Sequence, residues 1–396
     1  MKPVEIAKGI YSVGVADFNI RDFHGYSTEA GTTYNAFLIV DEKVVLIDTV
    51  KKEFADELLA NISEIIDPKK IDIVISNHTE MDHSGALPRI MHYIGEDKPL
   101  YCSRMGKKNL SAHFSQSWNL HPVKDGEELS LGSRTLMFME TRMLHWPDSM
   151  FTYVKEDEIL FSSDAFGQHY AGYELYDDVL GDAAMFQAKK YFANILMLYA
   201  PQVLKLVEKV SDMGLSFKMI CPDHGVFWRT GIGSIIDAYV RWSSHETGKR
   251  AVVIYDTMWK STRKMAEAIA DGISETGAAV SVIHIRSSHR SEIMTAVLDS
   301  KAVIIGSPTL NNCIFPTVAD VLTYMKGLRP KNRIGAAFGS YGWSGEAVKQ
   351  MSGELSSMGM ELLDEGLKIQ YVPDSDAIAS CREYGRKIGE AVCDRK

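Results

Sequence analysis

The chain has 396 residues, 45% of them apolar and 24% charged, and a formal net charge of −9 at neutral pH. This length predicts two domains, and the composition excludes a disordered or membrane-embedded chain. The acidic balance disfavours nucleic acid as a partner, because basic surfaces bind phosphate backbones. No apolar run reaches the roughly 18 residues of a spanning helix, and the first residues lack a signal-peptide core. We therefore expect a cytoplasmic protein without membrane contact.

The five cysteines are scattered along the chain and form no Cys-x-x-Cys pair. An odd, dispersed set excludes a disulfide framework, and it also excludes a built-in rubredoxin or iron–sulfur module. Any such electron carrier is expected to be a separate protein.

The first half of the chain predicts a mixture of strands and helices. β-Branched runs on either side of a polar break predict a hairpin of residues 34–40 and 44–48. Apolar residues at helical spacing predict a helix over 54–66, followed by a buried strand over 71–76. Further on, the pattern predicts a helix over 87–93 and strands at 100–102, 136–139, 150–154 and 159–163.

A concentration of metal-binding residue types follows the strand at 71–76. His78, Glu80, Asp82 and His83 lie within six residues, in a segment expected to be a turn. One such residue alone is usually structural, but four of them after an apolar strand would be costly to bury without a metal. His145, Asp164 and His224 each lie at a strand end or in a Gly/Pro turn, where loops carry function.

These seven residues predict a site for two metal ions. One ion would be bound by His78, His145 and a carboxylate, with Asp164 as the bridge, and the other by Asp82, His224 and His83. Hydrolases of the metallo-β-lactamase superfamily generally open with His-x-His-x-Asp-His, which suits zinc, whereas the second position here is Glu80. Two imidazoles with carboxylates favour non-haem iron, although ligand count alone leaves zinc open.

The second half of the chain begins after a short polar stretch, 245–250, which has the composition of a linker. From residue 251 strands and helices alternate regularly, which predicts a doubly wound parallel sheet. We expect strands at 251–255, 280–285, 302–306, 334–339 and 367–372, and helices at 264–275, 291–298, 317–326, 345–358 and from 376.

Three segments at successive strand ends of this sheet predict a flavin site. The first carries hydroxyls and backbone N–H groups before a helix, which suits a phosphate, and no glycine-rich dinucleotide fingerprint is present, so a mononucleotide is favoured over NAD. Tyr341 and Trp343 could stack on an isoalloxazine ring, although a single aromatic residue there is more often packing. The candidate FMN-binding residues are Thr257, Met258, Trp259, Ser261, Thr262, Pro308, Thr309, Leu310, Asn311, Asn312, Ser340, Tyr341, Gly342, Trp343 and Ser344.

The metal motifs and the flavin segments together resemble the flavodiiron proteins, also called A-type flavoproteins. The matches are the metal segment 78–83 and the segments 144–150, 164–169 and 222–225, and the resemblance covers essentially the whole chain. It implies an α/β protein with an N-terminal metallo-β-lactamase-like αβ/βα sandwich, residues 1–248, and a C-terminal flavodoxin-like doubly wound parallel sheet, residues 249–396.

The resemblance also implies roles for individual residues. One iron would lie on His78, Glu80 and His145, the other on Asp82 and His224, with Asp164 bridging them. The histidine matching His83 is an iron ligand in some members of the family and is displaced by water in others.

Two further residues resemble those that line the family's substrate pocket. His24 and Tyr191 could donate hydrogen bonds to the substrate, and the alternative is a structural turn histidine and a helix-face tyrosine. His169 is expected to be structural.

The implied activity is reduction of nitric oxide to nitrous oxide and of dioxygen to water. Electrons would pass from an external donor, such as rubredoxin or a reduced deazaflavin, through FMN to two iron ions per chain. The family arrangement implies a head-to-tail homodimer or a dimer of dimers. Two alternatives are a zinc-dependent hydrolase with a flavodoxin-like accessory domain, which Glu80 disfavours, and an electron carrier with a vestigial metal site.

Overall fold

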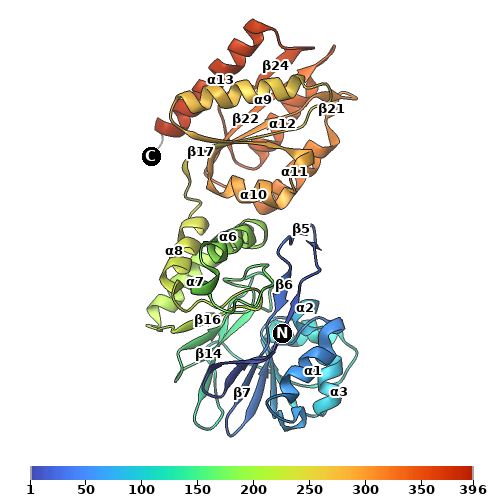
Figure 1. Cartoon of the computed structure of the whole chain (residues 1–396), viewed down its shortest axis with the longest axis vertical. Coiled ribbons are helices and arrows are strands. Elements are labelled where there is room, and N and C mark those ends of the chain that lie inside the picture. Colours follow the sequence, from blue (N-terminus) through green and yellow to red (C-terminus); the bar gives the residue numbers. More distant parts are fainter. Residues whose placement is uncertain (1, 395–396) are drawn as a thin grey trace. The chain divides into compact units, whose positions relative to one another are not determined.

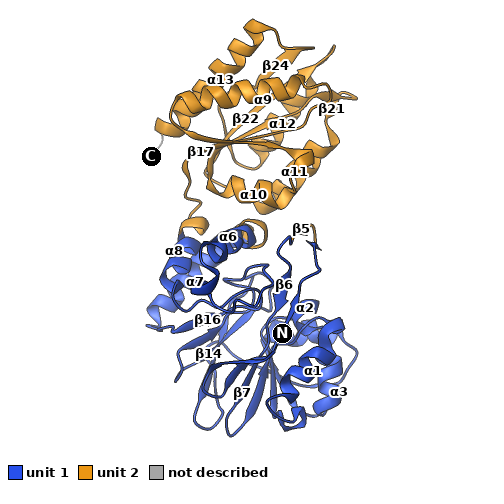
Figure 2. Ribbon diagram, in the orientation of Figure 1, with its two compact units in different colours: residues 1–23, 28–192, 199–240 blue, residues 24–27, 193–198, 241–396 orange. Residues whose placement is uncertain are grey.

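The computed structural model describes residues 2–394 of the chain. Its backbone divides into two compact units (Figures 1 and 2). The N-terminal unit comprises residues 1–23, 28–192 and 199–240, and the C-terminal unit comprises residues 24–27, 193–198 and 241–396. The domain boundary at residues 248/249 stays a prediction of the sequence.

The N-terminal unit is built on two β-sheets. The larger sheet has the order β1 (Val4–Ala7), β2 (Ile10–Ser12), β7 (Phe37–Val40), β8 (Val44–Ile47), β9 (Ile73–Ser76), β10 (Pro99–Cys102) and β11 (Asn119–Pro122). The smaller sheet has the order β12 (Glu128–Ser130), β13 (Thr135–Glu140), β14 (Met150–Val154), β15 (Ile159–Phe161) and β16 (Met219–Cys221). A separate ribbon pairs β3 (Val15–Asp17) with β6 (Thr32–Tyr34).

Side-chain alternation along the strands explains the layers of this unit. In β9, Ile73 and Ile75 join a core that also contains Phe138 and Phe161 of the smaller sheet, so the two sheets pack face to face. The intervening Val74 belongs to a second core beneath the helices. The helices are α1 (Ala55–Ser63), α2 (Met81–Ser84), α3 (Leu87–Ile94), α4 (Arg104–His113), α5 (Asp177–Leu180), α6 (Asp182–Tyr191), α7 (Ala200–Asp212) and α8 (Ile232–Ser243).

The C-terminal unit contains the predicted parallel sheet. Its order is β18 (Ala279–His284), β17 (Gly248–Tyr255), β19 (Ser300–Gly306), β22 (Ile334–Tyr341) and β23 (Glu361–Leu362), and β24 (Leu367–Gln370) also pairs with β22. All of these pairings are parallel. The helices are α9 (Ser261–Glu275), α10 (Arg290–Asp299), α11 (Pro316–Leu328), α12 (Glu346–Ser357) and α13 (Ser375–Asp394), with α9 and α13 on one face and α10 and α11 on the other (Figure 1).

The structure corrects two local predictions. The metal segment is not a turn throughout, because Asp82 and His83 lie in the short helix α2. Residues 248–250 are not linker, because β17 already begins at Gly248 and pairs there with Ser300. The polar composition of residues 248–250 suggested a linker because these first residues of β17 are exposed.

A buried arginine anchors the start of the C-terminal unit. Arg333 is 2% exposed, and its guanidinium donates to the backbone oxygens of Val297 (3.2 Å), Leu298 (2.7 Å) and His245 (3.2 Å). The Nδ1 atom of His245 accepts from the backbone N–H of Lys331 at 3.5 Å. Burial, with Arg333 and Lys331 nearby, lowers the pKa of His245 to about 4.

We expect His245 to make the C-terminal unit acid-sensitive. Because its folded pKa lies below its ordinary value of 6.5, the unfolded chain takes up the proton first, and stability falls as the pH drops from 6.5 to about 4. His245→Asn keeps an acceptor and tolerates the left-handed φ of 53° but does not titrate. In the variant, the fall of the free energy of unfolding with decreasing pH should be smaller by up to about 1.4 kcal/mol per pH unit. Urea unfolding, monitored by flavin fluorescence, measures it. If the free energy of unfolding depended on pH in the same way in the parent and in His245→Asn, the prediction would be wrong.

Candidate metal centre and flavin pocket

The predicted metal-binding residues all follow strands of the N-terminal unit. His78 and Glu80 lie in the loop after β9, and Asp82 and His83 lie in α2 directly behind it. Three more loops contribute one residue each: His145 comes after β13, Asp164 after β15 and His224 after β16. The two sheets therefore present their loops to one place, where the side chains form two groups.

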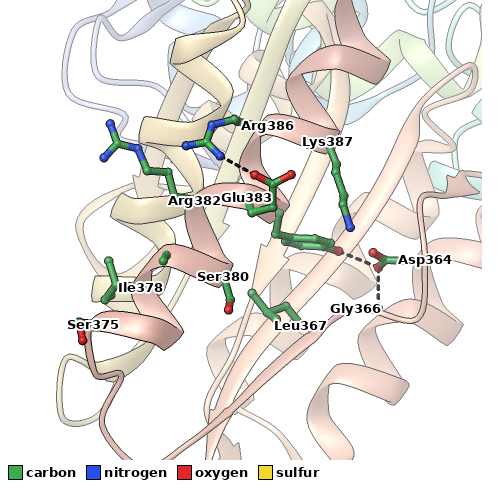
Figure 3. Close-up of a pocket in the computed structure, with 12 residues that line it drawn as sticks. Asp364, Gly366, Leu367, Ser375, Ile378, Ser380, Arg382, Glu383, Arg386 and Lys387 are labelled. Carbon is green, nitrogen blue, oxygen red and sulfur yellow. Dashed lines mark hydrogen bonds and ion pairs between the residues drawn. The ribbon is translucent and has the colours of Figure 1, made fainter.

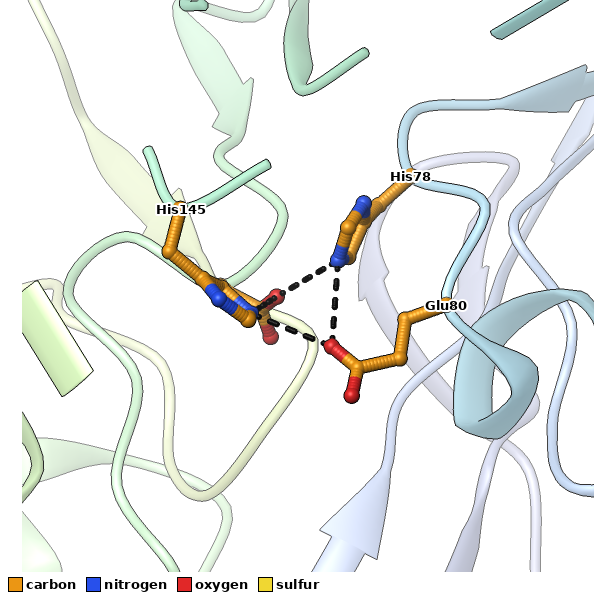
Figure 4. A group of neighbouring side chains, drawn as sticks. His78, Glu80 and His145 are labelled. Atoms are coloured by element: carbon orange, nitrogen blue, oxygen red, sulfur yellow. Dashed lines mark hydrogen bonds and ion pairs between the residues drawn. The ribbon is translucent and has the colours of Figure 1, made fainter. Parts of the chain in front are cut away.

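The first group comprises His78, Glu80, His145 and Asp164. The Nε2 atom of His78 lies 3.3 Å from Oε2 of Glu80 and 3.3 Å from Oδ2 of Asp164. The Nε2 atom of His145 lies 3.2 Å and 3.0 Å from the same two oxygens. Figure 4 shows His78 and Glu80, from one loop, and His145, from another segment, converging on one point.

The second group comprises Asp82, His83 and His224. The Nε2 atoms of both histidines lie 3.2 Å from Oδ2 of Asp82. The same two nitrogens lie 3.3 Å and 3.4 Å from Oδ1 of Asp164. Asp164 thus turns one carboxylate oxygen towards each group.

This arrangement fits two metal ions better than a hydrogen-bond network. Each imidazole Nε2 can donate one proton, yet each faces two carboxylate oxygens, and both oxygens of Asp164 are buried without a hydrogen bond within residues 2–394. Two donors about 2.1 Å from one ion are about 3.0–3.4 Å apart at octahedral to tetrahedral angles. The observed separations of 3.0–3.4 Å match that spacing.

The electrostatics keep the carboxylates ionised. Burial raises the pKa of Glu80, but hydrogen bonds with His145 and His78 outweigh it and bring the pKa down to about 2. Burial lowers the pKa of His145, but Asp164 and Glu80 outweigh it and raise the pKa to about 9. A histidine must lose its proton to bind a metal, so metal binding here would release protons.

The two predicted pocket residues occupy different surroundings. Tyr191, at the end of α6, is 1% exposed, and its ring lies 5.1 Å from that of His169 and 6.0 Å from that of His224. His24 is exposed in the turn between β4 (Asp22–Phe23) and β5 (Tyr26–Ser27). The Nδ1 atom of His169 lies 2.9 Å from the hydroxyl of Thr32, and its structural role stays a prediction. Roles for His24 and Tyr191 in catalysis stay predictions.

The three flavin segments of the C-terminal unit enclose a cavity of about 510 Å³. Its walls include thirteen of the fifteen candidate residues, and Thr257 and Thr262 are the two that do not line it. Trp259 and Trp343 are 88% and 86% exposed and form an aromatic rim that a planar ring could cover. Tyr371 and Val372 also line the cavity and were missed, because the predicted strand ran to residue 372, whereas β24 ends at Gln370.

The first of these segments is held by a buried carboxylate. Asp256 is completely buried, and its Oδ1 accepts from the backbone N–H of Thr257 at 2.6 Å. Its Oδ2 accepts from Nε of Arg286 at 3.0 Å and from the hydroxyl of Thr317. These contacts position the loop before α9, whose N-terminus at Ser261 suits a phosphate.

A glutamine of α12 holds the second flavin segment. The side-chain oxygen of Gln350 accepts from the backbone N–H of Ile314 at 3.0 Å, and its nitrogen donates to the backbone oxygen of Asn312 at 3.2 Å. The hairpin of β20 (Thr309–Leu310) and β21 (Cys313–Ile314) turns through Asn311 and Asn312, both with positive φ. Sequence reasoning named the turn residues but not the glutamine that fixes them.

A larger hollow, of about 890 Å³, lies elsewhere on the C-terminal unit (Figure 3). Its polar groups already bind one another: the hydroxyl of Tyr384 donates to Asp364 at 3.0 Å, and Arg386 pairs with Glu383. It offers no group of converging donors, so the smaller cavity at the strand ends is the better flavin site.

The fold and the two sites define a lactamase-like metal-binding domain joined to a flavodoxin-like domain. Residues 32–225 match the family model described as ODP family beta lactamase, and residues 253–385 match that of flavodoxin. The nitric oxide reductase of Moorella thermoacetica is 46% identical, over 99% of this chain and 100% of that relative. The rubredoxin-oxygen oxidoreductase of Megalodesulfovibrio gigas is 44% identical, over 99% and 98%.

Solved structures agree over the whole chain. That of the rubredoxin oxygen:oxidoreductase from Desulfovibrio gigas has a TM-score of 0.97 at 41% identity and covers 99% of each chain. The flavodiiron protein from Giardia intestinalis gives 0.96 at 35% identity, over 100% of this chain and 97% of that one. The chain belongs to the flavodiiron protein family, as the resemblance implied, and its predicted fold class is confirmed.

Proposed function

We propose that this chain binds two iron ions in the N-terminal unit and FMN in the C-terminal unit. His78, Glu80 and His145 would hold one iron, Asp82, His83 and His224 the other, and Asp164 would bridge them. The single observation that carries this assignment is the carboxylate of Asp164, which faces each donor group with one oxygen at 3.0–3.4 Å. FMN would occupy the 510 Å³ cavity, with its phosphate at the start of α9.

The chain is an oxidoreductase that reduces nitric oxide to nitrous oxide, dioxygen to water, or both. Reduced iron and reduced flavin, when bound, would supply the electrons: two electrons and two protons convert two NO to N2O and water, and four of each convert O2 to two waters. The comparisons favour this chemistry over the hydrolase alternative, because relatives covering the whole chain are named as reductases and oxidoreductases.

The chain's own residues shape the approach of substrate. The side chains of Glu80 and His145 are 14% and 18% exposed, whereas those of Asp82, Asp164 and His224 are at most 3% exposed. A diatomic gas would therefore arrive beside Glu80 and His145. The rings of Tyr191 and His224 pack on that of His169, with centroids 5.1 Å and 4.9 Å away, and all three side chains are buried.

The electron donor is an external protein or carrier. One relative is named for rubredoxin, and the described chain contains no Cys-x-x-Cys pair of its own, so rubredoxin or a reduced deazaflavin is the proposed donor. Among residues 2–394 there is no helix with the length and apolarity of a membrane span. A cytoplasmic location and a head-to-tail homodimer or dimer of dimers belong to this proposal.

Two assays of the purified protein test the function: consumption of NO without O2, and consumption of O2 added to reduced protein. Iron and FMN are measured in the same sample. We expect two irons and one FMN per chain and turnover with a reducing carrier. Zinc in place of iron, no yellow chromophore and hydrolysis of an ester or lactam would contradict the proposal.

A further inference from the structure

Metal-binding histidines usually give their second ring N–H to a carboxylate or carbonyl, which fixes the tautomer and the ring orientation. In this centre the Nδ1 atom of His78 lies 3.2 Å from Oδ2 of Asp148, and that of His224 lies 2.6 Å from the backbone oxygen of Thr33. Asp148 is itself held by the backbone N–H and the hydroxyl of Thr79, both at 2.8 Å. A hydrogen bond at Nδ1 therefore fixes the orientation of both rings.

His83 lacks such a bond in the described part of the chain. Its Nδ1 atom is buried without a hydrogen-bond partner, and the facing group is Oδ2 of Asp223 at 3.7 Å. Asp223 is completely buried, and neither of its carboxylate oxygens has a hydrogen bond within residues 2–394. A buried carboxylate without hydrogen bonds costs several kcal/mol, so such a group persists where a partner compensates it.

Hydrogen bonds hold the backbone of Asp223, whereas its carboxylate has none within residues 2–394. Its N–H donates to the oxygen of Ser163 at 2.8 Å, and its oxygen accepts from the N–H of Asn35 at 2.8 Å. A movement of under about 1 Å would bring the carboxylate to the ordinary N–H···O distance from His83. The chain thus places a hydrogen-bond acceptor behind His83, whose counterpart binds iron in some members of the family and not in others.

We propose that Asp223 is a positioning residue for His83 that accepts its Nδ1–H and holds its Nε2 on the second metal. The inference rests on the proposed metal centre. With the Nδ1 proton on the side of Asp223, the Nε2 lone pair points at the group shared with Asp82 and His224, and His83 acts as a resident ligand.

The test compares Asp223→Ala and Asp223→Asn with the parent full-length protein. Anaerobic titration of metal-depleted protein with Fe(II), and with Co(II) as an optical probe, measures the two affinities separately. We expect Asp223→Ala to weaken one site by about 10–100-fold and leave the other within a factor of about three. Asp223→Asn should recover part of the loss, because its amide oxygen can still accept a hydrogen bond.

Stability without metal distinguishes positioning from a structural role. Removing an unbonded buried carboxylate should leave the metal-depleted protein as stable as the parent or more so, while the metal-loaded protein melts at a lower temperature. Asp148→Ala is the matched variant, and it should lose stability in both forms because Asp148 already has hydrogen bonds. Unchanged affinities in Asp223→Ala, or equal loss of stability with and without metal, would overturn the inference, whereas a parent that binds no metal would overturn the proposed function instead.

Discussion

Asp164→Ala should remove both metal ions while leaving FMN in place. Asp164 is 1% exposed, and it is the residue whose two oxygens face both donor groups. Each metal would lose a charged ligand, so we expect each affinity to fall by more than about 100-fold and turnover with NO or O2 to fall to background. Metal analysis and flavin absorbance of one purified sample measure the two cofactors together.

His145→Ala is the matched comparison, because His145 belongs to the first group only. It should lose one metal and gas reduction but keep the second metal, FMN and the reducibility of FMN. Unchanged turnover would remove His145 from the site. Two metals bound at parental affinity in Asp164→Ala would show that the carboxylate does not bridge.

A second variant controls for the loss of any buried aspartate. Asp177 is 6% exposed, and its carboxylate accepts from the backbone N–H groups of Arg229 (2.8 Å) and Gly231 (2.6 Å), in neither metal group. Asp177→Ala should lower the melting temperature yet retain two metals. If it also lost both metals, the result for Asp164→Ala would reflect unfolding and not ligation.

The sequence could indicate which residues gather at the candidate metal centre, because these residue types are recognisable locally. Four of the donor residues crowd behind one apolar strand and the other three lie where strands end, which marks them as candidates. The packing of the two sheets, which the sequence did not specify, brings the loop after β9 together with those after β13, β15 and β16. The groups behind the histidines could not be predicted in this way. Asp148 and Asp223 are single aspartates whose partners, His78 and His83, are 70 and 140 positions earlier. Only the tertiary fold brings these atoms within reach.

The flavin site shows the same division. The regular alternation of strands and helices predicted where the strands end, and hydroxyl and aromatic residues at three of these ends indicated the flavin segments. Tyr371 lines the flavin cavity because β24 pairs with β22. The two strands are about 30 positions apart in the chain, and their residue patterns do not reveal that they pair. The helix α2 was missed because it is four residues long, shorter than any periodicity can reveal.

Gly385→Ala should destabilise the C-terminal unit by about 3 kcal/mol. A Cβ atom at Gly385, on α13, would lie 2.1 Å from the backbone oxygen of Ile269 on α9, and one at Gly272 would lie 1.9 Å from that of Arg382. Because the opposing atoms are backbone, the helices must separate to relieve the overlap. Since α9 begins at Ser261 beside the flavin cavity, FMN should dissociate at lower urea concentration and temperature.

Gly353→Ala separates this close approach from the general effect of alanine in a helix. Gly353 lies within α12, and a Cβ atom there would meet nothing within 4 Å. Alanine should therefore stabilise that helix by about 0.5–1 kcal/mol, since it restricts the unfolded chain and favours helix. Flavin-fluorescence unfolding of the full-length variants should thus move in opposite directions for the two substitutions. A Gly385→Ala variant as stable as the parent, or stabilised like Gly353→Ala, would mean that α9 and α13 can separate without cost and that their contact does not hold the FMN loop.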